Sequence, residues 1–403
     1  MTGIIKAIIN GNKIYVIWVT FLLVLSLIGL HAYARQLIYG LYVTGMGDEV
    51  SWGFYIANFA FLVGMAAAAV MIVIPVYIFN DKDLKKVVIF AELFAISAVI
   101  MCLSFVLIDL GRIDRMWHLI PFIGIFNWPD SMLTWDVIVL NGYLFINIFV
   151  CAYFLYKVKK GEEPKTWIYI AVVFLSIVWA PSIHTVTAFL FQGLGARPFW
   201  HSPLIAPRFL SSAFSAGPAF ILIVLILLNK FKAIKISFQT IRRIRLIVTV
   251  CLLINIFFFF SEVFAELYMP TSHSINLAFL LGVKGKSILT PWIRLSLAMT
   301  IVAAIMFLIP SLMKKEVFVI IACILTDIGI WLEKGLGFVI PGFIPTQLGD
   351  FVQYKPTLNE VLITIGVWAA GLLLYTFFVK IAVSIINSKE GGDTEIYEYS
   401  QLK

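Results

Sequence analysis

Ten long apolar segments run through this chain, and they limit its possible folds more than any other feature. The segments cover residues 14–40, 51–79, 86–110, 134–157, 166–193, 207–230, 244–268, 289–313, 317–337 and 358–387. A helix of about 20 apolar residues crosses the hydrocarbon core of a bilayer, whereas the strands of a membrane barrel are shorter and alternate in polarity. The sequence therefore predicts an all-α, polytopic membrane protein with about ten transmembrane helices.

The composition excludes the other broad classes of protein. Hydrophobic residues make up 62% of the 403 residues and charged residues 13%, where a soluble domain is roughly half apolar and about one quarter charged. The four cysteines, at positions 102, 151, 251 and 323, all lie inside apolar segments. They form neither a disulfide framework nor a haem-attachment motif. A lipid bilayer is thus the expected surrounding of this chain.

The distribution of basic residues predicts the orientation. With ten spans, both termini lie on the same side, and that side receives most of the 30 Lys and Arg residues. Because cytoplasmic loops are enriched in Lys and Arg, we expect a multi-pass protein of the cell membrane with both termini in the cytoplasm. The net charge of +8 then follows from the topology and gives no support for binding to nucleic acid.

A short internal repeat predicts two related halves. The segment Ser131-Met132-Leu133-Thr134-Trp135, before the fourth span, resembles Ser287-Ile288-Leu289-Thr290-Pro291-Trp292, before the eighth. We interpret this as two four-helix bundles, spans 2–5 and 6–9, related by an axis along the membrane normal and flanked by spans 1 and 10. The predicted units are an N-terminal transmembrane helix (1–50), a first bundle (51–195), a second bundle (196–340), and a C-terminal transmembrane helix with a cytoplasmic tail (341–403).

Titratable residues gather toward the predicted outer face. All five histidines lie there, at positions 31, 118, 184, 201 and 273, together with Asp109, Glu262 and Glu266. Ionisable residues in membrane spans are costly and often functional. The stretch from Asp109 through Arg112 to His118 has two interpretations. It is either an interfacial helix whose charges face water, or the rim of a pocket where Asp109 and His118 exchange protons while Arg112 fixes their charge state.

Two further groups of residues have open alternatives. His184 lies about two turns inside the fifth span, where an imidazole is either a proton carrier or ligand, or a packed and satisfied side chain. Trp52, Tyr55 and Asn58 lie roughly on one face of the second span. They either bind the ring and carbonyl oxygens of a quinone or serve as interfacial anchors and a helix–helix hydrogen bond.

Bound redox cofactors have little support in the sequence. A membrane haem needs two axial imidazoles at matched depth, and only His184 lies clearly within a span, with His31 near the end of another. No cysteine pair has the spacing of metal ligands. We therefore expect any electron carrier of this chain to be diffusible and lipid-soluble.

Several short motifs of this chain match those of a known family. They are Trp52-Gly53 with Asn58, Asp109-Leu110-Gly111-Arg112, and Ser131-Met132-Leu133-Thr134-Trp135. On these motifs the chain resembles the NrfD/PsrC family of integral membrane subunits of quinone-linked oxidoreductases. The stretches Ala196-Arg197-Pro198-Phe199-Trp200, Ala206-Pro207-Arg208-Phe209 and Trp135-Asp136 are most similar to the branch containing DsrP, from the DsrMKJOP complex of dissimilatory sulfur metabolism.

The resemblance implies a function, partners and site residues. It implies a subunit without haem or iron–sulfur cluster that binds menaquinone near the outer face and exchanges electrons with an extracytoplasmic, ferredoxin-like iron–sulfur subunit. A multihaem cytochrome c and a second membrane subunit are the further partners that it implies. The catalytic residues would be Asp109, His118 and His184, and the quinone-binding residues Tyr55, Asn58, Arg112, Trp135 and Asp136. Candidates for a proton path are Glu92, Glu262 and Glu266.

Two other classes of function remain open at this stage. A duplicated bundle with polar residues is compatible with a secondary transporter, although transporters usually place their sites near the midplane at broken helices. A passive anchor that only docks redox partners is the third hypothesis. Neither a transporter nor a passive anchor would carry out quinone chemistry, which distinguishes both from a quinone-reactive subunit.

Overall fold

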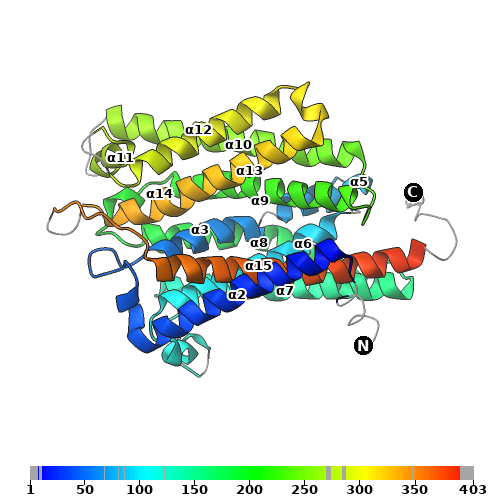
Figure 1. The fold of residues 1–403 in the computed structure, drawn as a ribbon, viewed down its shortest axis with the longest axis horizontal. Coiled ribbons are helices and arrows are strands. Elements are labelled where there is room, and N and C mark those ends of the chain that lie inside the picture. Colours follow the sequence, from blue (N-terminus) through cyan, green and yellow to red (C-terminus); the bar gives the residue numbers. More distant parts are fainter. Residues whose placement is uncertain are drawn as a thin grey trace.

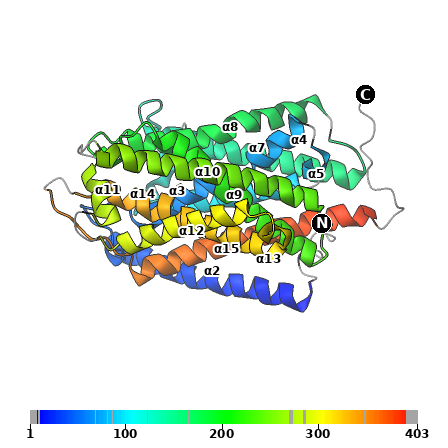
Figure 2. The ribbon, with the colours of Figure 1, turned by 90° about the horizontal axis from the view of Figure 1, so that it is seen from above.

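The computed structural model describes residues 8 and 11–390, except for 68, 80, 86, 122, 165, 269–273, 284–286 and 346–348. Within these ranges the secondary structure is helical and no residue belongs to a strand. The long helices run roughly along one common axis (Figures 1 and 2). The expectation of an all-α, polytopic membrane protein is confirmed.

Nine helical segments in the described part of the chain are long and apolar enough to cross a membrane. They comprise α2 (Lys13–Tyr39), α3 (Phe54–Ala67) continued by α4 (Val70–Tyr77), α6 (Val88–Asp109), α7 (Met132–Lys160), α8 (Trp167–Gln192), α9 (Ile205–Lys230), α10 (Phe238–Tyr268), α12 (Thr290–Leu308) and α15 (Leu358–Glu390). Two short helices lie in connections, α5 (Lys82–Lys85) and α11 (Ser274–Leu281), and a 3₁₀ segment, η2, covers Ile113–Leu119.

The predicted span 317–337 is not a continuous α-helix. It begins as the 15-residue α13 (Glu316–Ile330), passes into a six-residue π-helix (Trp331–Leu336), and ends in α14 (Gly337–Val339) and a 3₁₀ segment (Ile340–Phe343). Because α2 begins and α15 ends at the same end of the molecule (Figure 1), the chain makes an even number of passages. The interrupted segment therefore brings the number of passages in the described part of the chain from nine to ten.

The helices form two rings with the same order of contacts. In the first, α3 packs on α6, α6 on α7, α7 on α8, and α8 on α3. In the second, α9 packs on α10, α10 on α12, α12 on α13, and α13 on α9. The repeated sequence noted above begins the third helix of each ring, α7 and α12. The unit boundaries at residues 195 and 340 themselves remain predictions.

Helix α3 forms the centre of the molecule. All 14 of its residues are buried, because it contacts α6 and α8 of its own ring, α9 of the second ring, and the π-helix. Outside the rings, α2 and α15 pack on each other (Figure 2), and α15 also packs on α6. Gly29 and Gly366 permit this pairing, since a Cβ built on Gly29 would lie 2.4 Å from the Cα of Gly366.

Candidate functional site

An aromatic cavity lies where the α2/α15 pair meets α3 and the second ring. Its volume is about 500 Å³, within the usual range of small-molecule sites. Two of its lining residues, Trp18 and Phe21, are also exposed on the apolar outer surface of α2, so the cavity borders the lipid-facing side of the bundle. Aromatic rings supply much of the lining: Trp18, Phe21, Phe54, Phe61, Phe220, Trp331 and Trp368.

Asn58 holds two of these rings in place. Its Oδ1 accepts hydrogen bonds from the indole nitrogens of Trp331 and Trp368, at 3.0 and 2.9 Å, and its Nδ2 donates to the carbonyl oxygen of Phe54 at 2.8 Å. Trp331 belongs to the π-helix and Trp368 to α15. Asn58 therefore joins three elements at the wall of the cavity.

Two other polar side chains line the cavity and have no internal partner. Asp327 Oδ1 and Thr364 Oγ1 are buried without a hydrogen bond. Since buried polar atoms in folded proteins are nearly always hydrogen-bonded, these two are free to bind polar atoms of a ligand. Asp327 comes from α13 and Thr364 from α15, so they belong to different walls.

A hydrogen-bonded network lies at the end of the bundle where α3 begins. Tyr55 donates from its hydroxyl group to Gln36 Oε1 at 2.6 Å, and Gln36 Nε2 donates to the carbonyl oxygen of Ile108 at 2.9 Å. Asp109 interacts electrostatically with Tyr55, and its Oδ1 is buried without a hydrogen bond. The structure thus brings the predicted residues Tyr55 and Asp109 together.

Glu360, in the first turn of α15, interacts electrostatically with Tyr55 and Asp109 and forms hydrogen bonds of its own. Its Oε1 accepts from the hydroxyl group of Tyr354 at 2.6 Å, and its Oε2 accepts from the backbone amide of Gly45 at 2.7 Å. Burial and the nearby Glu360 carboxylate raise the pKa of Tyr354, so the phenol stays protonated and remains a donor. Glu360 therefore ties the connection after α2 to the beginning of α15.

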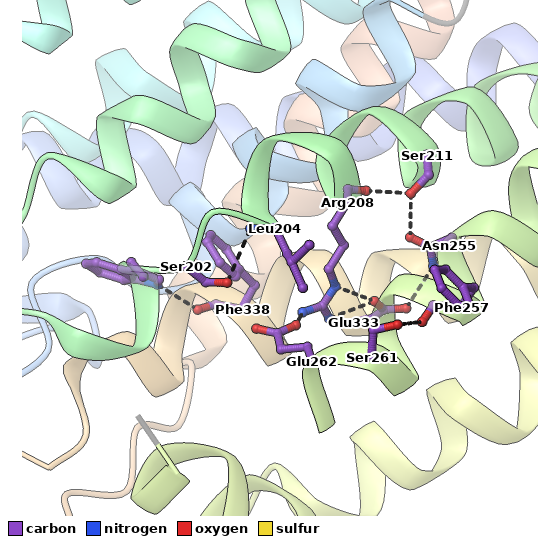
Figure 3. Close-up of polar contacts among 11 residues, drawn as sticks. Ser202, Leu204, Arg208, Ser211, Asn255, Phe257, Ser261, Glu262, Glu333 and Phe338 are labelled. Carbon is purple, nitrogen blue, oxygen red and sulfur yellow. Dashed lines mark hydrogen bonds and ion pairs between the residues drawn. The ribbon is translucent and has the colours of Figure 1, made fainter. Parts of the chain in front are cut away.

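A cluster of charged side chains lies in the second ring, with the guanidinium of Arg208 between the carboxylates of Glu262 and Glu333 (Figure 3). Arg208 of α9 forms ion pairs with Glu262 of α10 and with Glu333 of the π-helix, the second at 2.8 Å. Asn255 Nδ2 donates to the other oxygen of Glu333 at 3.3 Å. The next residue, Lys334, is only 5% exposed. Removing charges from water requires such pairing, and we refer to Arg208, Glu262, Glu333 and Asn255 as the charge cluster.

His184 and Asp136 lie inside the first ring. Asp136 Oδ1 accepts a hydrogen bond from the hydroxyl group of Thr187 at 2.7 Å. His184, one turn before Thr187 on α8, is fully buried, and neither of its ring nitrogens has a hydrogen-bond partner. Neither residue lines the aromatic cavity.

Three predicted site residues lie at or near the surface. Arg112 is paired with Asp114 at 2.8 Å, both largely exposed, and the guanidinium lowers the pKa of the Asp114 carboxyl through hydrogen bonds. His118 stacks on Trp117 at 3.8 Å between ring centroids. Trp135 donates from its indole nitrogen to the carbonyl oxygen of Pro129 at 2.8 Å. The structure does not bring these residues to the aromatic cavity.

The predicted proton-path residues lie in different places. Glu92 is buried near the beginning of α6, at the opposite end from Asp109, and interacts electrostatically with Tyr143 and Tyr169. Glu262 belongs to the charge cluster. Glu266 lies one turn later on α10, and its backbone carbonyl accepts from Ser274 at 2.6 Å. His273, counted among the outer histidines, lies outside the described residues.

Sequence reasoning missed two interior basic residues. Arg208 and Lys334 lie within the predicted spans 207–230 and 317–337 but were not selected as site residues, whereas the structure buries Lys334 and leaves only 13% of the Arg208 side chain exposed. The π-helix continues the helical path past Lys334 and carries Glu333, which pairs with Arg208. The only available signal was the pair of adjacent opposite charges at the end of an apolar segment. Asp327, Thr364 and Glu360 had no sequence signal of a site.

Comparison with known proteins gives a match over most of the chain. Residues 42–343 match the model of the family described as polysulphide reductase, NrfD. This region includes both rings of helices, the π-helix and the charge cluster, and it leaves out α2 and α15.

Several known proteins are similar over nearly their whole length. The Hdr-like menaquinol oxidoreductase integral membrane subunit of Archaeoglobus fulgidus is 24% identical, over 93% of this chain and 94% of that protein. A protein of Halobacterium salinarum, named as a putative membrane subunit of dimethyl sulfoxide reductase, is 24% identical with the same coverage. The menaquinone reductase integral membrane subunit of Nitratidesulfovibrio vulgaris is 24% identical, over 90% of this chain and 88% of that protein.

Proposed function

The chain belongs to the NrfD polysulphide reductase family, and from this we propose that it is the quinone-reactive membrane subunit of a multisubunit respiratory oxidoreductase. The names of similar proteins from two organisms refer to menaquinol or menaquinone. The observation that carries the proposal is the aromatic cavity beside lipid, with two unpartnered polar atoms in its walls.

The residues of the cavity fit a quinone. Its aromatic walls suit a flat, apolar ring, and its border with the lipid-facing surface suits an isoprenoid tail. The Thr364 hydroxyl group can donate to a quinone carbonyl oxygen, and a protonated Asp327 can do the same. A bound menaquinone would supply the electron transfer, while this chain binds the ring, excludes water and exchanges protons.

Asn58 and the network around Tyr55 have different roles in this proposal. Asn58 positions Trp331 and Trp368, because its carbonyl oxygen is already used by both indoles. Tyr55 and Asp109 lie nearer the end of the bundle, where the unpartnered Asp109 Oδ1 is suited to exchange protons with the outer aqueous side. Within the complex, Arg112 and His118 remain candidates for contacts at that surface.

We further propose the partners and the setting. The electron partner is an extracytoplasmic, ferredoxin-like iron–sulfur subunit at the end of the bundle that carries Asp109. The other members of the complex are a multihaem cytochrome c and a second membrane subunit, which gives a complex of the DsrMKJOP type in dissimilatory sulfur metabolism. Both termini lie in the cytoplasm. Co-purification of the intact complex with mass spectrometry and metal analysis tests the partner set.

Quinone binding can be tested on the purified chain by titration with a soluble menaquinone analogue, followed by quenching of tryptophan fluorescence. Saturable quenching is expected, because Trp18, Trp331 and Trp368 line the cavity. Thr364→Val removes one hydrogen bond to the ring and should weaken binding by about 3- to 10-fold. Thr326→Val is the matched control, since its hydroxyl group bonds to Ala322 of its own helix and does not line the cavity.

The outcome separates this proposal from its rivals. Absence of saturable binding to the wild-type chain and to its complex would contradict the proposed function. Solute counterflow by the chain in liposomes would instead favour the secondary transporter, and co-purified redox subunits without any quinone binding would favour the passive anchor.

A further inference from the structure

The connection between α6 and α7 contains a long stretch without charge. Residues 116–129 include no Asp, Glu, Lys or Arg, although they join two membrane spans at the end of the bundle that carries Asp109. Within this stretch Ile123 is 67% exposed and Ile125 76%. Single exposed apolar residues are ordinary on a protein surface, whereas a contiguous group marks contact with a membrane or a partner. We refer to the described residues of this stretch as the apolar loop.

The apolar loop folds back on itself. It begins in the 3₁₀ segment η2, and the backbone amide of Gly124 then donates to the carbonyl oxygen of Ile120 at 3.1 Å. A Cβ built on Gly124 would lie 2.2 Å from the Cα of His118, so the returning chain is in close contact with η2. At the other end, the indole nitrogen of Trp135 donates to the carbonyl oxygen of Pro129 at 2.8 Å. The exposed isoleucines therefore belong to a hydrogen-bonded turn.

This loop lies beside a span that faces lipid. At the end of α6, a Cβ built on Gly111 would lie 3.0 Å from the side chain of Leu41, so the connection packs against the 3₁₀ segment that follows α2. Most large apolar side chains of α2 are exposed, as expected for a helix in contact with lipid. Figure 1 shows the chain between α6 and α7 at the side of the bundle, next to the end of α2 and the beginning of α7. The exposed apolar surface of the loop thus continues that of α2.

Aromatic residues mark the level of the membrane interface at this end. Trp and Tyr are enriched where the hydrocarbon core meets the headgroups. Trp117 and Trp128 of the loop are 45% and 52% exposed, and Tyr42, in the segment after α2, is 95% exposed. The charged pair Arg112–Asp114 lies just before the loop and is largely exposed. Apolar and aromatic residues beside charged ones are typical of a segment that lies in the plane of the interface.

Water and a protein partner account less well for this surface. Burying isoleucine side chains in an apolar phase is favourable, and leaving two neighbouring ones in water forgoes that gain. A partner that docks at the end of the bundle would contact surfaces facing along the helix axes. The apolar loop instead lies at the side, continuous with the lipid-facing surface of α2 (Figure 1).

We propose that the apolar loop is an interfacial lipid-binding segment. Ile123 and Ile125 insert among the acyl chains of the leaflet nearest Asp109. Trp117 and Trp128 lie at the level of the headgroups. The ligand is the acyl-chain and glycerol region of phospholipids, and no particular headgroup is needed. The loop thereby holds the end of α6, and with it Asp109, at a fixed depth in the membrane. This role goes beyond the proposed quinone chemistry, since it needs neither a quinone nor a partner subunit.

The depth of the loop can be measured with a fluorophore on a single cysteine. All four native cysteines are buried, so Ile125→Cys can be labelled selectively with nitrobenzoxadiazole and the full chain placed in lipid nanodiscs, where both faces are open to buffer. We expect phospholipids brominated on their acyl chains to quench the label by about 2-fold or more, and iodide in the buffer to quench it only weakly, as for a group below the headgroups.

Gly195→Cys is the matched control. It lies in the exposed loop after α8, at the same end of the bundle, and no atom lies within 4 Å of its added Cβ. Its label should show the opposite pattern, with strong quenching by iodide and little by brominated lipid. Ile123→Cys repeats the measurement two residues away. Because Ile123 and Ile125 are both more than half exposed, neither substitution removes a packed core side chain.

Two results would overturn the proposal. Equal quenching by iodide at positions 125 and 195 would place the loop in water. Shielding of position 125 from both quenchers in the intact complex, with iodide quenching in the isolated chain, would show that a protein partner covers the loop. Quinone binding is measured on the same samples and should be unchanged in Ile125→Cys, because none of the described residues of the loop lines the aromatic cavity. A failure of the quinone proposal is thereby distinguished from a failure of this one.

Discussion

Asn58 shows how a single side chain can determine the shape of a membrane cavity. Its one carbonyl oxygen accepts two indole N–H groups from helices that are distant in sequence. A tryptophan N–H has no alternative partner in an apolar interior, and leaving a buried donor without a partner costs about 1–3 kcal/mol. The residue therefore stabilises the cavity wall rather than offering a free group to a ligand.

Asn58→Leu should lower the free energy of unfolding by about 2–5 kcal/mol, because two buried N–H groups lose their acceptor. It should also weaken binding of the menaquinone analogue, since Trp331 and Trp368 are no longer held. Thermal unfolding in detergent and the fluorescence titration measure both effects. Asn141→Leu is the control: Asn141 also donates to a carbonyl of its own helix, at 2.8 Å, but it holds no indole. Equal stability of the two variants would contradict this role.

Individual site residues could be predicted from the sequence only in part. Tyr55, Asn58, Asp109, Asp136 and His184 were selected because polar residues in apolar segments are conspicuous, and each is engaged in or beside an interior site. Which of these residues share a site could not be predicted, because the hydropathy of a segment does not determine which other helices it packs against. Tyr55 and Asn58, three residues apart, therefore belong to two different networks.

At the scale of elements, the π-helix Trp331–Leu336 connects the aromatic cavity with the charge cluster. Its first residue bonds to Asn58 at the cavity, and its third pairs with Arg208. Such π segments frequently occur at functional sites. The sequence predicted a helix over 317–337, but a π turn has the same hydropathy as an α turn, so neither the interruption nor the inward direction of Glu333 and Lys334 could be foreseen.

Arg208→Met should be strongly destabilising, because Glu262 and Glu333 would lose their shared cation inside the bundle. Breaking a buried ion pair in this way costs about 3–5 kcal/mol. Glu333→Gln should cost less, because the amide oxygen still accepts from Arg208. Arg112→Met is the control, since the Arg112–Asp114 pair is exposed, and its thermal unfolding should match that of the wild type. A stable Arg208→Met protein would contradict the pairing.

The α2/α15 pair depends on close backbone contact. Gly366→Ala would place a Cβ 2.5 Å from the Cα of Gly29, so the two helices must separate. We expect a loss of about 1–3 kcal/mol, as for other overpacked interiors, together with weaker quinone binding, because both helices line the cavity. Gly47→Ala is the control, since no atom lies within 4 Å of its added Cβ. Unchanged unfolding and binding in Gly366→Ala would show that the pair does not need this contact.

At the scale of the whole molecule, the length and position of the apolar segments were sufficient to predict an all-α membrane fold. The first span was predicted at 14–40 and is found at Lys13–Tyr39, because an uninterrupted apolar segment has few alternatives in lipid. The order of contacts within the two rings could not be read from hydropathy. The arrangement has a consequence for function: the aromatic cavity lies where α3 and the second ring meet the α2/α15 pair, so it depends on the packing of units that the repeat alone would treat as independent.

The orientation of the molecule in the membrane can be tested by cysteine accessibility. All four native cysteines are buried, so the wild-type chain should give little labelling with a membrane-impermeant maleimide. Gly195→Cys, in the exposed loop after α8, should be labelled in intact cells, because positive-inside topology places that end outside. Lys235→Cys, in the exposed loop after α9, should be labelled only after permeabilisation. The reverse pattern would place the network of Tyr55, Asp109 and Glu360 at the cytoplasmic face, and the iron–sulfur partner would then have to dock from the cytoplasm.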